Sequence, residues 1–147
     1  MLVPRLILAY EKPYIIEETD PRENMMERPI FKVIIAGGRT FQNYEVLRDF
    51  CDKCLSRKAK THQIEVLSGC CRGADILGQE YARKNGFSIW YMPANWRDGK
   101  SAGPQRNQLM AENADALIAF WDGRSRGTKN MIEIAKKLKL LIRVKMY

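Results

Sequence analysis

One repeated pattern constrains this chain more than any other. From residue 31 onward, an apolar run, a loop and an amphipathic stretch follow one another four times. This alternation is typical of βα units, in which each helix returns the chain to start the next strand of a parallel sheet. We expect strands at 32–36, 63–67, 88–92, 116–121 and 140–146. We expect helices at about 43–58, 75–85, 103–113 and 128–138, with Gly86 ending the second as a C-cap and Pro104 at the first position of the third.

The apolar patterns of the strands indicate their places in the sheet. Runs 32–36 and 116–121 are apolar on both faces, as central parallel strands are. Run 140–146 alternates apolar and polar residues, which fits an edge strand. The sequence predicts a single α/β domain of the Rossmann-like class, with a five-stranded, mainly parallel sheet in the order 3-2-1-4-5 and helices on both faces.

Residues 1–30 break this pattern. They hold two short apolar pieces, 6–10 and 14–16, separated by Glu11-Lys12-Pro13. We expect an N-terminal arm or hairpin over 1–30 that packs on the sheet or on a second subunit, which makes a homodimer possible. The ligand-binding domain is then residues 31–147.

Composition and charge narrow the class of partner. Hydrophobic residues make up 46% of the 147 and charged residues 29%, so a globular domain is expected. Residues 1–30 carry 4 basic and 6 acidic side chains, net −2, and the rest carry 21 and 11, net +10. A basic body suits nucleic acid, a nucleotide or another phosphate ligand.

Targeting and metal signals are weak in this sequence. No apolar run approaches the ~20 residues of a membrane span, and the start lacks the order of a signal peptide, so we expect a cytoplasmic protein without a membrane partner. Reduced cysteines are expected, and Cys51-x-x-Cys54 with Cys70-Cys71 is a poor match to a zinc site. We predict no metal ion and no cofactor.

Four loops are expected on the rim where parallel sheets bind ligands, outside the carboxyl ends of the strands. They are 37–41, 68–75, 93–102 and 122–128, and three of them are rich in glycine. Glycine lets backbone N–H groups approach an anion at a helix start, or simply permits a tight turn. In the predicted order, the first and fourth loops face each other across the crevice.

Basic side chains gather in these loops and in the helix turns that follow them. A cation at a helix N-terminus lies at the positive end of the helix dipole and is destabilising by ~0.3–1 kcal/mol unless an anion lies nearby. The cluster therefore indicates a phosphate or carboxylate ligand, with solvated rim side chains as the alternative. Its members are Arg39, Arg72, Arg97, Lys100, Arg106, Arg124, Arg126 and Lys129.

The roles of four other side chains are interpreted from their positions. Asp75 is first an N-cap of the second helix and otherwise recognises a ribose or a base. Asp122 follows a central strand and is the one candidate catalytic residue, as a general base, or it binds ribose. Trp96 lies in a loop and either belongs to the core, stacks on a base or covers the site. His62, the only histidine, falls on the opposite rim, which argues against a triad.

Four ordered motifs carry a resemblance to a known family. They are Gly37-Gly38-Arg39-x-Phe41, Ser68-Gly69-x3-Gly73-Ala74-Asp75, Ala102-Gly103-Pro104-x-Arg106-Asn107-x2-Met110 and Asp122-Gly123-x-Ser125-x-Gly127-Thr128. Together they resemble the YspA/YpsA-related branch of the SLOG superfamily, which includes DprA/Smf and the LOG phosphoribohydrolases. The resemblance covers residues 31 to about 145 and implies a Rossmann-like, nucleotide-binding domain.

The resemblance and the loops together predict a binding site for a nucleotide or a nucleotide-derived, phosphoribosyl ligand. The alternatives are a nucleotide hydrolase of the phosphoribohydrolase type and, with less weight, DprA-like binding of single-stranded nucleic acid. The predicted ligand-binding residues are Gly37, Gly38, Arg39, Ser68, Gly69, Arg72, Gly73, Asp75, Arg106, Asn107, Gly123, Ser125, Gly127 and Thr128.

The chain departs from the family pattern at three places. Thr40 stands where the family often has Asp, and Cys70 and Cys71 stand where it has small residues. LOG enzymes carry a glutamate that assists N-glycosidic cleavage, and Met131 occupies the matching position here. Glu133 lies about 200° further round the helix and is expected to point away. We therefore expect binding more than catalysis.

Overall fold

A computed structural model describes residues 3–7, 15–19 and 27–147 of the chain. Its main sheet has the order β5-β4-β3-β6-β7, and every pairing in it is parallel. The strands are β3 (Ile30–Gly37), β4 (Gln63–Ser68), β5 (Ser88–Tyr91), β6 (Ala116–Trp121) and β7 (Leu141–Met146). This confirms the predicted five-stranded sheet, its order and the edge position of the last strand.

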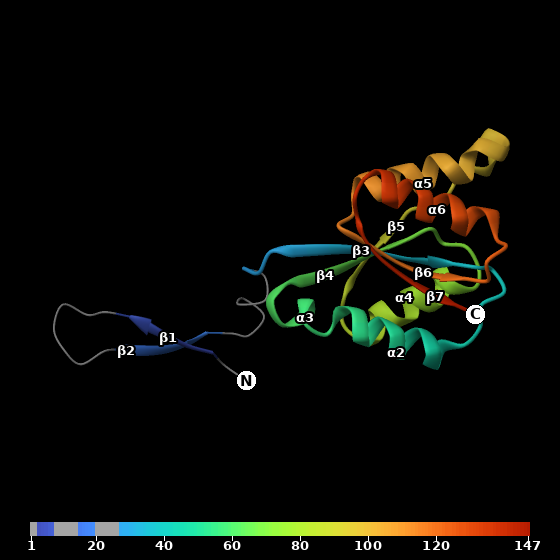
Figure 1. Cartoon of the computed structure of the whole chain (residues 1–147). Coiled ribbons are helices and arrows are strands. Elements are labelled where there is room, and N and C mark those ends of the chain that lie inside the picture. Colours follow the sequence, from blue (N-terminus) through green and yellow to red (C-terminus); the bar gives the residue numbers. More distant parts are fainter. Residues whose placement is uncertain (1–2, 8–14, 20–26) are drawn as a thin grey trace.

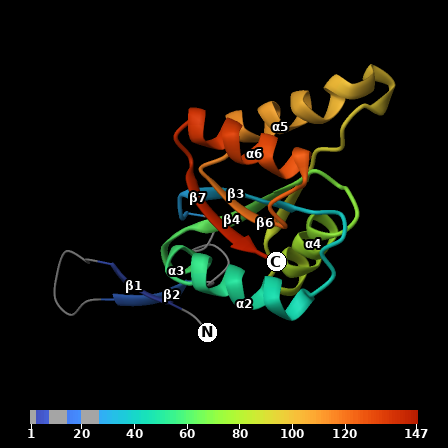
Figure 2. The ribbon, with the colours of Figure 1, turned by 45° about the vertical axis from the view of Figure 1, so that its right-hand side comes forward.

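Helices cover both faces of the sheet. In Figures 1 and 2, α5 (Ala102–Glu112) and α6 (Arg126–Lys137) lie on one face, and α2 (Tyr44–Leu55) and α4 (Ala74–Lys84) lie on the other. Alternate residues of a strand point to opposite faces. Val33 and Ile35 therefore belong to the core beneath α2 and α4, and Ile34 belongs to the core beneath α5 and α6.

Several helix boundaries differ from those predicted. The segment expected as one helix over 43–58 is α2 followed by the short α3 (Lys58–Thr61), and a 3₁₀ helix, η1 (Trp96–Ser101), precedes α5. Helix α5 begins at Ala102, so Pro104 is its third residue and not its first. Proline is accepted throughout a first turn because those N–H groups have no partner within the helix.

The caps of α4 correct one prediction and confirm another. The N-cap is Gly73, so the expectation that Asp75 caps this helix is wrong; Asp75 lies in the first turn and is buried. At the other end, Gly86 has φ +69° and Phe87 N–H donates to the Ala82 carbonyl. Gly86 therefore ends the helix in the left-handed conformation that glycine adopts readily, as predicted.

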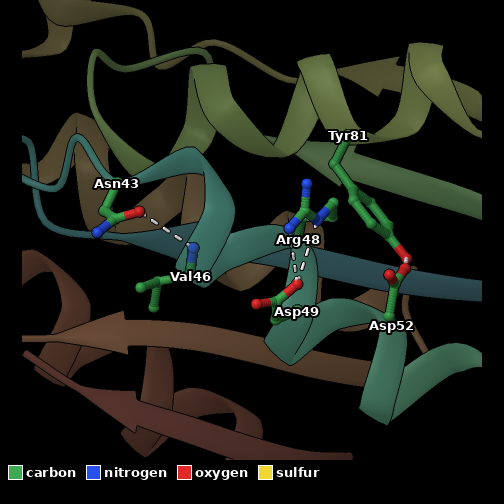
Figure 3. Close-up of polar contacts among 6 residues, drawn as sticks. All are labelled: Asn43, Val46, Arg48, Asp49, Asp52 and Tyr81. Atoms are coloured by element: carbon green, nitrogen blue, oxygen red, sulfur yellow. Dashed lines mark hydrogen bonds and ion pairs between the residues drawn. The ribbon is translucent and has the colours of Figure 1, made fainter.

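A tyrosine hydroxyl joins α4 to α2 (Figure 3). The Tyr81 hydroxyl donates to Oδ1 of Asp52 over 2.7 Å, and the tyrosine is only 2% exposed. Burial, followed by the hydrogen bond to Asp52, raises the pKa of Tyr81. At its start, α2 is capped by Asn43, whose side chain accepts a hydrogen bond from Val46 N–H. The Tyr81–Asp52 hydrogen bond thus ties α2 to α4, while the Asn43 cap stabilises the start of α2.

A second, two-stranded sheet is formed near the N-terminus. Strands β1 (Val3–Ile7) and β2 (Ile15–Thr19) pair antiparallel, with Leu6 opposite Ile16. Residues 1–2, 8–14 and 20–26 of the predicted arm lie outside the described residues. Among the residues that are described, no helix has the length and apolar character to cross a membrane.

Candidate functional site

A cleft of about 660 Å³ opens at the carboxyl ends of β3 and β6. These neighbouring strands mark the point where the winding of the sheet reverses, which is where open α/β sheets bind ligands. The loop after β3, the start of α4, η1, the first half of α5 and the start of α6 all contribute to its walls. The first and fourth loops therefore meet at one cleft, as predicted.

Most of the predicted site residues line this cleft. Those that line it are Gly37, Gly38, Arg39, Asp75, Arg106, Asn107, Asp122, Ser125, Gly127 and Thr128. Those that do not line it are Ser68, Gly69, Arg72, Gly73 and Gly123. Asn130 also lines the cleft and was not predicted as a site residue, whereas Trp96 and Lys100, which line it too, were candidates outside the predicted ligand-binding set.

Arg106 is held in place by contacts to the second loop. Its guanidinium donates to the Gly69 carbonyl, and its Nε donates to Oδ1 of Asn107 over 3.0 Å. A Cβ on Gly69 would come within 2.5 Å of Nη1 of Arg106 and 2.8 Å of Oδ2 of Asp75. Gly69 therefore affects the cleft without lining it, because its lack of a side chain leaves room for both charged groups.

Asp75 is a buried carboxylate beneath this arginine, with 5% of its surface exposed. Burial raises its pKa to about 6, and the opposing effects come from the Cys71 N–H, Arg106, Arg39 and the Gly37 N–H. The Cys71 N–H donates to Oδ2 over 3.0 Å. Asp75 thus links the first and second loops, and its environment is that of a structural acid more than of an open ribose ligand.

Two of the predicted phosphate-binding glycines serve loop packing. A Cβ on Gly37 would strike the Phe120 carbonyl, and one on Gly73 would strike the backbone of Gly38 and Arg39. Gly73 also has φ +85°, and the next residue, Ala74, donates its N–H to the Gly38 carbonyl over 3.2 Å. The loops after β3 and β4 are in backbone contact, and only glycine permits it.

Two further members of the second loop lie away from the cleft. Ser68 is fully buried, and its Oγ accepts hydrogen bonds from the Gln79 amide over 2.9 Å and from Cys70 N–H over 3.2 Å. Arg72 is exposed on the surface and is not among the residues lining the cleft. Ser68 thus supports the loop, and direct binding by either residue stays a prediction.

The start of α6 forms the opposite wall. Ser125 is its N-cap and accepts a hydrogen bond from Thr128 N–H over 3.4 Å, while the two hydroxyls lie 3.1 Å apart. Asn107 reaches from α5 to donate to the Gly127 carbonyl and to Oδ1 of Asn130. Position 127 is open, since no atom of the described residues lies within 4 Å of where a Cβ would be. This wall is held by side chains and leaves space at Gly127.

Asp122, the candidate general base, shapes the turn before α6. Its Oδ1 accepts hydrogen bonds from Arg124 N–H and Ser125 N–H, both over 2.8 Å. These two bonds hold the pKa of Asp122 below its usual range. A carboxylate stabilised in this way is a weak proton acceptor at neutral pH, although it lines the cleft.

Four basic side chains line the cleft: Arg39, Lys100, Arg106 and Arg126. Lys129, predicted to signal an anion at the start of α6, instead has its ammonium 3.9 Å from Glu133 on the exposed side of the helix. Glu133 thus lies away from the cleft, as expected, while Met131 lines it and is 1% exposed.

Comparison with known sequences identifies a family model and a relative. A family model described as the YspA, cpYpsA-related SLOG family matches residues 31–99. Gene 61 protein of Mycobacterium phage D29 is 32% identical over 113 residues, which cover 72% of this chain and 89% of that protein.

Solved structures share the fold. DNA processing protein A (DprA) from Streptococcus pneumoniae has a TM-score of 0.62 at 14% identity, covering 82% of this chain and 51% of that chain. DprA from Helicobacter pylori gives 0.56 at 19% identity, covering 82% and 67%. The protein TM1055 gives 0.52 at 18% identity, covering 78% and 72%. The chain spans about half the length of the S. pneumoniae protein. Its fold is that of DprA, and by its sequence the chain belongs to the YspA, cpYpsA-related SLOG family.

Proposed function

We propose that the cleft binds or senses a nucleotide or a nucleotide-derived, phosphoribosyl ligand. The observation that carries this proposal is the meeting of Arg39, Lys100, Arg106 and Arg126 in one cleft of about 660 Å³ at the switch point of the sheet. Small-molecule sites commonly measure about 300–1,000 Å³ and place a few polar groups against an apolar lining. The cleft has the size and the charge for a phosphorylated small molecule.

The two acidic side chains of the cleft, Asp75 and Asp122, do not neutralise its four basic side chains. Asp75 is buried with a raised pKa of about 6, and Asp122 uses one oxygen for two backbone N–H groups. Arginine binds phosphate through paired N–H donors, and its guanidinium stays charged at all physiological pH values. An anionic ligand therefore gains more from this cleft than a neutral one does.

The two walls suggest how the ligand lies. We assign phosphate to the first and fourth loops, because Arg39 and the start of α6 at Ser125, Gly127 and Thr128 line the same cleft. A helix N-terminus favours negative charge. Of the two carboxylates proposed for ribose, Asp122 is the better placed, because Asp75 is buried beneath Arg106.

Thermal unfolding with matched ligands tests this function. The panel pairs each nucleoside 5′-monophosphate with its uncharged nucleoside and adds ADP-ribose, NAD and cyclic dinucleotides. A ligand at ~100 times its Kd adds about 2.7 kcal/mol, which raises Tm by roughly 6 °C or more in a chain of this size. We expect shifts with phosphorylated members alone. Equal shifts for nucleosides and nucleotides, or none in the panel, would contradict the proposal.

Binding of single-stranded nucleic acid is the second candidate. It is supported by the net +10 of residues 31–147 and by the fold shared with H. pylori DprA, a protein whose structure was described for its binding of single-stranded DNA. If all four cleft cations contacted phosphates, a plot of log K against log salt would have a slope of about −3. Oligonucleotide binding whose affinity does not fall with salt in this way would exclude the candidate. So would the absence of oligonucleotide binding in a protein whose Tm is raised by a nucleotide.

We do not extend the proposal to hydrolysis. The position of the LOG glutamate holds Met131, which is 1% exposed, and the pKa of Asp122 is lowered by its turn. We expect no release of free base from nucleoside monophosphates over hours at high protein concentration. Release that is lost in Asp122→Asn would instead establish the phosphoribohydrolase alternative.

A further inference from the structure

Trp96 is a large aromatic side chain placed at the cleft and not in the core. It begins η1, lines the cleft and is 55% exposed. The N-cap of η1, Asn95, accepts a hydrogen bond from Arg97 N–H, which fixes the start of this turn. An indole left this exposed is not explained by burial, because packing in the core would remove most of its surface from water.

Two neighbours define the space around the indole. The guanidinium of Arg39 lies 5.6 Å from the ring centroid, within the range of a cation–π contact. On α5, a Cβ at Gly103 would lie 3.7 Å from Cη2 of the indole, which is ordinary van der Waals contact, so one edge of the ring lies beside the start of this helix. The ring therefore lies between a cleft cation and the start of α5, and more than half of the residue's surface stays exposed.

We propose that Trp96 binds the nucleobase by stacking, so that the ligand class of this cleft is intact nucleotides and not sugar phosphates without a base. This inference rests on the proposed function, because it assumes a ligand whose phosphate lies among the cleft cations. Bases of every kind have a flat π face and stack on aromatic side chains. Arg39 lies near both groups, since it lines the cleft and contacts the indole.

The chain supplies a matched control on β5. Trp90 is 37% exposed and has Lys32 Nζ 4.5 Å from its ring centroid, so it too is an exposed indole beside a cation. Its Nε1 donates to Glu65 over 2.9 Å, and it does not line the cleft. Replacing Trp90 repeats the chemical change made at Trp96 at a place where no ligand is proposed.

The experiment measures Kd by calorimetry for AMP, GMP, CMP and UMP and for ribose 5-phosphate. We expect the wild-type chain to bind at least one nucleotide about fivefold or more tightly than ribose 5-phosphate, from the stacking contribution of one base. Trp96→Ala should remove that advantage and leave the Kd of ribose 5-phosphate unchanged. Trp96→Phe should keep part of it, and Trp90→Ala should keep all of it.

The outcomes separate this inference from the function on which it rests. Equal Kd values for nucleotides and ribose 5-phosphate, or an advantage that survives in Trp96→Ala, overturn the role of Trp96 while phosphate binding stands. No binding of any of the five probes overturns this inference, and the proposed function falls with it if ADP-ribose, NAD and the cyclic dinucleotides also leave Tm unchanged. An unchanged Tm of Trp96→Ala shows that the variant is folded, as expected for an exposed side chain.

Discussion

Arg106 lies directly against Gly69, since its guanidinium donates to the glycine carbonyl and a Cβ there would come within 2.5 Å of Nη1. The carboxylate of Asp75 lies on the same side, 2.8 Å from that Cβ position. A glycine outside the cleft thus decides where a cleft cation lies. Three separate elements, the loop after β4, the start of α4 and α5, meet at this point.

Replacing this glycine should weaken ligand binding more than folding. In Gly69→Ala, Arg106 and Asp75 must move, and the arginine leaves the position from which it reaches the ligand. Loss of a hydrogen bond to a charged group is worth about 1.5–3 kcal/mol, so the Kd for AMP should rise about tenfold or more. Calorimetry measures this change.

The matched glycine is Gly127, where a Cβ would have no atom within 4 Å in the part of the chain that the structure describes. Gly127→Ala should keep Tm or raise it, because alanine favours the helix by roughly 0.5–1 kcal/mol. An AMP affinity of Gly69→Ala equal to that of the wild type would show that Arg106 does not contact the ligand.

Asp75 should make the stability of the fold depend on pH. The folded chain keeps its proton up to about pH 6, whereas the unfolded chain releases it near pH 3.9. The folded state therefore binds more protons between these values. The resulting stability is fully present below about pH 4 and is lost as the pH rises through 6. The loss is of the order of 2–3 kcal/mol.

Urea unfolding at several pH values between 4 and 7.5 checks this effect. Asp75→Asn is neutral throughout and should lack this part of the pH dependence, while all other carboxylates contribute equally in both proteins. The difference in free energy of unfolding between the two proteins should therefore change with pH, in favour of the variant at pH 7.5. Parallel pH profiles would contradict the burial of a titrating Asp75.

The hydroxyl that joins α4 to α2 should contribute measurably to stability. Tyr81→Phe keeps the buried ring and removes only the hydrogen bond to Asp52, so the free energy of unfolding should fall by about 1–2 kcal/mol. Arg48→Ala removes an ion pair to Asp49 whose two side chains are both exposed, and should leave stability unchanged within error. A larger loss in Arg48→Ala than in Tyr81→Phe would reverse this order.

The sheet could be predicted because its strands are apolar runs between loops. Residues 116–121 were predicted as a strand and are β6, with both faces buried in the two cores. The turn at Trp96–Ser101 was missed, since it is short, has no hydrophobic periodicity and contains Gly99 at φ +73°. The local hydrophobic pattern therefore predicted the strands of the sheet but not the irregular turn at Trp96–Ser101.

The site was predicted in its location more than in the roles of its residues. Loop positions on a parallel sheet follow from topology, which is why Arg39 and Ser125 meet in one cleft. What Gly73 does depends on the backbone of Gly38, a contact between loops that no spacing reveals. The sequence gives one indication that Trp96 lies at the site: it is an aromatic residue in a loop that also carries basic residues.

Comparison of Arg39→Ala with Arg72→Ala tests whether a nucleotide binds in this cleft. Both arginines were predicted to bind the ligand, yet Arg39 lines the cleft and Arg72 does not. We predict that a nucleotide raises Tm of the wild type and of Arg72→Ala by the same amount, and that Arg39→Ala loses most of this shift. Equal shifts in all three proteins, or a loss confined to Arg72→Ala, would contradict nucleotide binding in this cleft.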